Sequence, residues 1–153
     1  MTYKLRNNRQ IILLMNKIFI AFLLCFFCTN LLSKENNDYF KLGQENFNKK
    51  NIDKAKLNFE KDIVRNTKNI ESYLFLAKIH KEKENNQEFE KYLKTVLILD
   101  PKNEEALYLL ITKKIKDADY DFAREKYEIF SKYCSKLCSK KSEIDRLIKK
   151  SKS

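Results

Sequence analysis

The chain has 153 residues, of which 35% are charged, and 32 basic against 21 acidic side chains give a formal net charge of +11. This length suits one domain, and a single glycine with a single proline is too little for a turn-rich β protein. One glycine also excludes the nucleotide-binding motifs Gly-x-Gly-x-x-Gly and Gly-x-x-x-x-Gly-Lys, each of which needs more than one.

The N-terminal residues have the pattern of a secretory signal sequence. Four basic side chains precede an apolar run over residues 18–27, and no acidic residue occurs before Glu35. The apolar run is shorter than the roughly 20 residues that a membrane-spanning helix needs. We therefore expect residues 1–33 to be a signal sequence, with Met15 as an alternative start of translation.

The signal sequence predicts where the protein is found. Cleavage after Ser33 is expected to give an exported chain, either periplasmic or associated with the membrane on the outer side of the inner membrane. In one alternative the signal is retained as an anchor. In another, a lipid is attached at Cys25 or Cys28, although Leu24 and Phe27 stand where that attachment prefers small residues.

The rest of the chain repeats with a period of 34 residues. The units are residues 36–69, 70–103 and 104–137. Each unit has two stretches with apolar residues three and four positions apart, which predicts two amphipathic helices joined by a turn. Asn51, Asn85 and Asp119 precede the second stretch of each unit and can cap its helix.

The shared positions of the units resemble the tetratricopeptide repeat, whose period is also 34. The seventh residue of each unit is leucine, the eighth is Gly43, Ala77 or Ile111, and Pro101 closes the second unit. The resemblance implies an all-α fold, an α-solenoid of three helix-turn-helix repeats over residues 34–137. Such a solenoid has a concave groove that holds an extended or helical segment of a partner.

The repeat frame also predicts the residues of that groove. Phe40, Leu74 and Tyr108, the fifth residues of the three units, face the groove, and an exposed apolar strip usually marks a partner site. In the alternative, neighbouring units or the N-terminal segment cover them. The seventh residues, which are Leu42, Leu76 and Leu110, face the core. The other predicted groove residues are Gln44, Lys78, Lys81, Thr112 and Lys116.

Two cysteines remain after the signal sequence. Cys134 and Cys138 are expected to form a disulfide if the preceding helix ends near Tyr133, because a regular helix holds residues four apart in poor geometry for a bridge. Two free thiols are the alternative. The single histidine, His80, lies far along the chain from both, so no metal site is expected.

Residues 138–153 are expected to form a basic amphipathic capping helix or tail. Residues 132–153 hold eight basic and two acidic side chains, and Ile144, Leu147 and Ile148 form a short apolar stripe. This segment either covers the last apolar face of the solenoid or contacts an anionic membrane surface. Nucleic acid is not expected to be a partner of an exported chain.

These features predict a non-catalytic adaptor that binds another protein or peptide in the bacterial cell envelope. No catalytic residues and no cofactor are expected, since the chain has one histidine, no Gly-rich loop and no Ser–His–Asp set. The alternative function is an accessory subunit of an envelope enzyme, or a membrane-associated assembly factor anchored by an uncleaved signal or a lipid.

Overall fold

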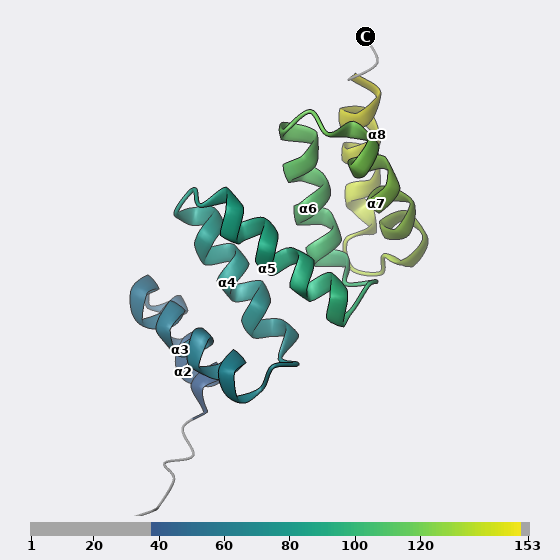
Figure 1. Cartoon of the computed structure of the whole chain (residues 1–153). Coiled ribbons are helices and arrows are strands. Elements are labelled where there is room, and N and C mark those ends of the chain that lie inside the picture. Colours follow the sequence, from purple (N-terminus) through teal and green to yellow (C-terminus); the bar gives the residue numbers. More distant parts are fainter. Residues whose placement is uncertain (1–37, 151–153) are drawn as a thin grey trace, which may run out of the picture. The chain divides into compact units, whose positions relative to one another are not determined.

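The computed structural model describes residues 38–150, which form seven α-helices and one short 3₁₀ helix (Figure 1). The predicted signal sequence, residues 1–33, lies outside the described residues. The elements are α2 (Tyr39–Asn48), α3 (Ile52–Arg65), α4 (Ile70–Glu82), α5 (Asn86–Leu99), α6 (Glu104–Lys116), α7 (Tyr120–Tyr133), η1 (Cys138–Lys140) and α8 (Lys141–Lys150). No helix in this part of the chain has the length and apolar character to cross a membrane.

The helices form three consecutive pairs, α2 with α3, α4 with α5, and α6 with α7, one pair for each predicted unit. Each later pair stacks on the one before it, because α4 packs on α3 and α6 packs on α5 (Figure 1). Units in such a stack contact only their neighbours in sequence. The fold is therefore the predicted all-α solenoid, with α8 packed against the last pair.

The predicted helix caps are present in two of three pairs. Asn85 and Asp119 accept the backbone N–H groups of Glu88 and Phe122 at 3.3 and 3.4 Å. Asn51 makes no side-chain cap bond, so the prediction is wrong for α3. Asn51 is exposed, and water can reach the N–H groups at this helix start.

The turn inside each pair contains a second repeated feature, a residue with positive φ. Lys50, Glu84 and Ala118 are 34 residues apart and have φ values of 61°, 56° and 60°. In the first of these turns, the N–H of Asn51 donates to the C=O of Asn46 at 2.9 Å, and the other two turns repeat this bond. Glycine usually occupies this left-handed position after a helix because other residues are strained there.

Close packing explains the small residue in the first helix of the first unit. A Cβ atom on Gly43 would lie 2.5 Å from Cε1 of Phe59, which is fully buried and stacks on Phe75 with ring centroids 4.7 Å apart. The equivalent residue of the third unit, Ile111, is fully buried in a cluster that also contains Phe130. The third unit therefore buries a larger side chain at this position.

Leu42 does not share the environment of its two equivalents, so the prediction that it faces the core is wrong. Leu76 and Leu110 are fully buried, whereas Leu42 is 37% exposed. Helices α3 and α5 pack on α4 and α6, but no described helix precedes α2. This face of a first helix is therefore buried only where the second helix of a preceding unit lies against it.

The positive φ values allow a direct test of the turn. We expect Lys50→Gly to raise the free energy of unfolding by roughly 0.5–1 kcal/mol, because glycine adopts this conformation without a Cβ clash. The neighbouring variant Lys49→Gly is the matched control, since Lys49 is also exposed but has φ of −80° and should lose stability instead. Urea unfolding followed by circular dichroism measures both, and stabilisation by both variants would contradict this interpretation.

Candidate functional site

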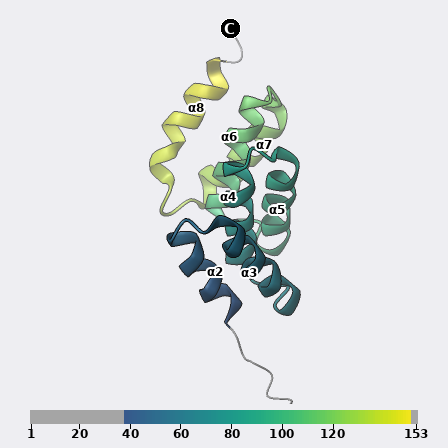
Figure 2. The ribbon, with the colours of Figure 1, turned by 90° about the vertical axis from the view of Figure 1, so that its left-hand side faces the viewer.

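An open groove of about 800 Å³ lies between the end of α4, helix α6 and helix α8. In Figure 2, α8 stands on one side of α6 and α5 lies on the other. Four of the eight predicted groove residues line it, namely Lys81, Tyr108, Thr112 and Lys116. Leu109 and Ile115 of α6 and Leu147 of α8 add apolar surface to the same groove.

The charged side chains of the groove differ in whether they are already paired. Lys113 is held by Asp117 and by Glu90 of α5. Lys81 and Lys116 are exposed and make no ion pair with any residue in the part of the chain that the structure describes. Two ammonium groups next to apolar side chains are therefore free to contact a ligand. Glu84 also lines the groove and makes no ion pair within residues 38–150.

The remaining polar residues predicted for the groove lie elsewhere. Lys78 pairs with Glu105 at 2.7 Å and joins α4 to α6, and its ammonium lies 5.2 Å from the centre of the Phe75 ring. Gln44 is half-buried on α2. The structure thus does not bring Lys78 and Gln44 to the groove between α6 and α8.

Leu74 is only 8% exposed and belongs to the main core cluster, so the prediction that it lies open in the groove is wrong. The residue that follows Leu74 along α4, Phe75, is the partly buried one. Phe75 packs on Phe40 and Phe47 of the preceding unit, with centroid distances of 6.2 and 5.2 Å. Leu109, the equivalent of Phe75 in α6, packs against the cluster that contains Leu74.

Phe40 and Tyr108 are half-buried rather than fully open. The Phe40 ring lies 6.1 Å from that of Phe59. The Tyr108 ring lies 6.5 Å from that of Phe130, and the Lys140 ammonium is 5.7 Å from its centre. Of the three residues predicted to form an exposed apolar strip, Tyr108 is the one that lines the groove.

A disulfide joins Cys134 and Cys138, with the two Cα atoms 5.3 Å apart. It follows directly on α7, which ends at Tyr133, as the predicted pairing requires. The chain leaves the helix at Cys134, whose ψ of 146° is extended, and continues into η1. The bridge thus closes a tight loop between the last repeat and the C-terminal helix.

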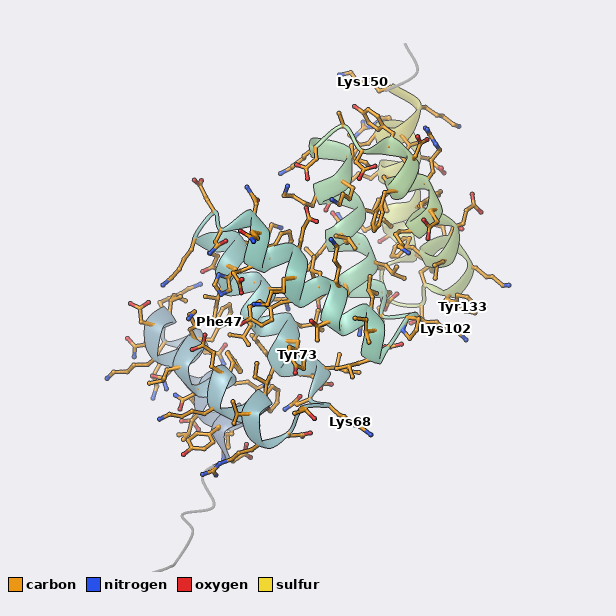
Figure 3. All side chains as sticks on the ribbon, viewed as in Figure 1. Phe47, Lys68, Tyr73, Lys102, Tyr133 and Lys150 are labelled. Atoms are coloured by element: carbon orange, nitrogen blue, oxygen red, sulfur yellow. A yellow bond between two sulfur atoms is a disulfide. The ribbon has the colours of Figure 1, made fainter. Side chains whose placement is uncertain are left out.

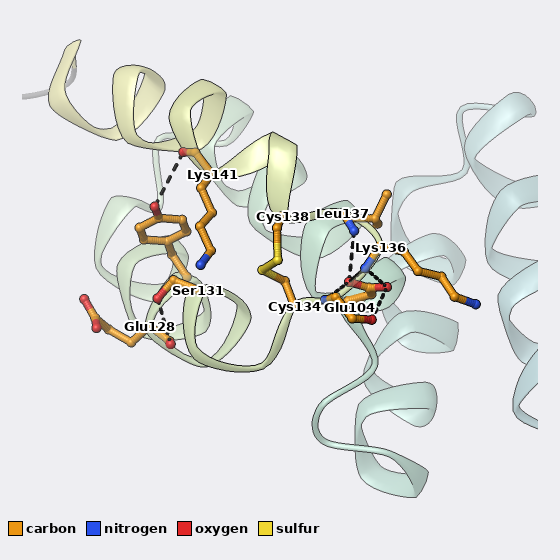
Figure 4. The surroundings of a disulfide bond; sticks show 10 residues. Glu104, Glu128, Ser131, Cys134, Lys136, Leu137, Cys138 and Lys141 are labelled. Atoms are coloured by element: carbon orange, nitrogen blue, oxygen red, sulfur yellow. Dashed lines mark hydrogen bonds between the residues drawn. A yellow bond between two sulfur atoms is a disulfide. The ribbon is translucent and has the colours of Figure 1, made fainter.

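The Glu104 carboxylate binds the backbone of this loop (Figure 4). The N–H groups of Ser135, Lys136 and Leu137 donate to it at 2.8, 3.0 and 3.1 Å. These bonds, led by that from Ser135, hold the pKa of Glu104 below its usual range. Glu104 lies in the first turn of α6, and nothing in the sequence relates it to a loop 31 residues later.

Helix α8 covers the last apolar face of the repeats. Ile144 is fully buried and Ile148 nearly so, in one cluster with Phe130. The hydroxyl of Tyr127 donates to the C=O of Lys141 at 3.5 Å. Burial and the neighbouring Asp145 carboxylate raise the pKa of Tyr127 to about 12, so its proton remains available for this bond.

His80 of α4 is buried beside Tyr92 of α5. Its ring stacks on Tyr92 at 5.4 Å, and neither ring nitrogen has a hydrogen-bond partner among the described residues. Burial lowers the pKa of His80, which favours the neutral imidazole. Residues 38–150 contain no group of three or more side chains placed to hold a metal ion.

Comparison with known proteins assigns one unit to a repeat family and shows a similar fold. Residues 70–103 match the family model described as "Tetratricopeptide repeat". A solved structure, described as "TPR2B-domain:pHsp70-complex of yeast Sti1", superimposes with a TM-score of 0.61. It is 20% identical in sequence, and the match covers 75% of this chain and 94% of that one, so the likeness shows a shared fold. No curated protein matches the chain.

The disulfide is expected to contribute to stability. Reduction should lower the free energy of unfolding by about 2 kcal/mol, because the bridge restricts the unfolded chain over a short loop. Urea unfolding with and without dithiothreitol measures the difference, and a variant with Cys134→Ser and Cys138→Ser is the control that should not respond to reductant. Two free thiols in the untreated protein would contradict the pairing.

Proposed function

We propose that this chain, whose second unit matches the tetratricopeptide repeat model, is a non-catalytic adaptor that holds a segment of another protein in the groove between α4, α6 and α8. Arrays of stacked helix pairs present extended surfaces suited to such segments. The structurally similar domain of yeast Sti1 was solved in a complex with pHsp70, which supports a protein or peptide as the class of partner.

The composition of the groove is the observation that carries this proposal. Leu109, Ile115 and Leu147 can cover one apolar side chain of a partner, and burying a side chain of that kind contributes about 1.5–3 kcal/mol. The unpaired ammonium groups of Lys81 and Lys116 can bond carbonyl or carboxylate oxygens of the same segment. Together these contacts suit a short segment with one apolar anchor and nearby acceptors.

We place the adaptor in the envelope of a bacterial cell, as an exported protein. This part of the proposal depends on the order of basic and apolar residues in residues 1–33, which lie outside the described residues. The mass of the mature chain from native cells tests it, since removal of those residues is expected. The alternative of an envelope accessory subunit shares the same groove contact and differs only in what the partner does.

Photo-crosslinking from inside the groove tests the adaptor function. A photoreactive residue in place of Thr112, which lines the groove, should give adducts of defined mass in intact cells. Thr95 is the matched control, because it is also a half-buried threonine whose hydroxyl bonds a carbonyl one turn earlier, but it lies on α5 and does not line the groove.

A second variant links the adducts to the groove chemistry. Lys81→Glu combined with Lys116→Glu should remove the Thr112 adducts at only a small cost in stability, because neither lysine forms an ion pair within residues 38–150 and each reversed charge at a helix C-terminus costs about 0.3–1 kcal/mol. Adducts that form equally from Thr95, or that persist in the charge-reversed protein, would contradict the proposal.

A further inference from the structure

The acidic side chains of the C-terminal helix are already engaged within the fold. Glu143 pairs with Lys140 at 3.1 Å. Asp145 lies beside the Tyr127 phenol, whose pKa it helps to raise. Five basic side chains of the same region have no carboxylate partner among the described residues: Lys136, Lys141, Arg146, Lys149 and Lys150.

Three of these cations share the outer face of α8. Arg146, Lys149 and Lys150 are exposed and lie on the side of the helix opposite Ile144, which is fully buried. We propose that this outer face docks on the anionic surface of a lipid bilayer. Because the apolar stripe of α8 is already buried in the protein, the contact is electrostatic and needs no insertion into the membrane.

A shallow hollow next to this face suits a phosphate headgroup. It has a volume of about 580 Å³ and lies where η1 joins α8. Hydroxyl groups of Ser139 and Ser142 and the guanidinium of Arg146 line it and can donate to phosphate oxygens. Glu143 and Lys140 also line the hollow, but their charges are paired with each other.

The shape and composition of the face favour a membrane over a nucleic acid. The cations lie on one side of a single ten-residue helix, which can meet a flat charged surface. Helix α8 has no aromatic residue on which an unpaired base could stack. The signal-like residues 1–33 also predict that the chain reaches a membrane. This contact does not depend on the groove, which α8 lines through Leu147.

The test compares two variants of the full chain that lose the same charge at different places. The tail variant carries Arg146→Gln, Lys149→Gln and Lys150→Gln, and the control carries Lys49→Gln, Lys54→Gln and Lys68→Gln at exposed lysines of the first unit. Figure 3 shows Lys150 and Lys68 far apart on the structure. Sedimentation with vesicles of phosphatidylcholine, alone or with about one-third phosphatidylglycerol, gives the binding ratio between anionic and neutral lipid.

The tail variant should lower this ratio about tenfold or more, while the control should leave it nearly unchanged, because charges more than about 10 Å from the bilayer are screened. Equal loss in both variants, or no loss in the tail variant, would overturn the proposal. Tighter binding to a duplex RNA oligonucleotide than to anionic vesicles, lost only in the tail variant, would make the face a nucleic-acid surface and would also overturn it.

Discussion

The fold depends on the contact between each first helix and the second helix of the preceding unit. At the first such contact, Phe59 of α3 stacks on Phe75 of α4. The Asp62 carboxylate accepts hydrogen bonds from the Asn69 amide and the Ser72 hydroxyl, both at 2.6 Å. Ser72 is fully buried, so this carboxylate satisfies a polar group that would otherwise be costly inside the core. Apolar burial and this buried hydrogen bond together hold α4 against the first unit.

At the C-terminal end, α8 takes the place that a further first helix would occupy. Its two buried isoleucines cover the last unit, and the disulfide loop and Glu104 hold the connection to it close to the start of α6. The same placement puts Leu147 opposite Tyr108 and Ile115 in the groove. Helix α8 therefore ends the stack and also forms one wall of the candidate site. A partner that binds in the groove should for this reason also stabilise α8 against unfolding.

The helices and their pairing could be predicted because they follow from local periodicity, as in the steps of three and four residues from Tyr73 to Leu76 and Ala77, and from the cap at Asn85. Exposure could not be predicted from the repeat frame alone. Leu74 is buried in a core cluster against which Leu109 of the next unit packs. Leu42 is partly exposed, and among the described residues α2 lacks the preceding second helix that packs on α4 and α6. Glu104 binds a loop made 31 residues later, a contact that only tertiary structure creates.

The most direct measurement of the central claim is the loss of stability in Leu76→Ala and Leu42→Ala, which truncate equivalent leucines of successive units. Urea unfolding should show a loss of about 2–5 kcal/mol for Leu76→Ala, because the cavity lies at a contact between units. Leu42→Ala should cost less than about 1 kcal/mol, since that leucine is partly exposed. Equal losses in the two variants would contradict the claim that the preceding second helix is what buries this face.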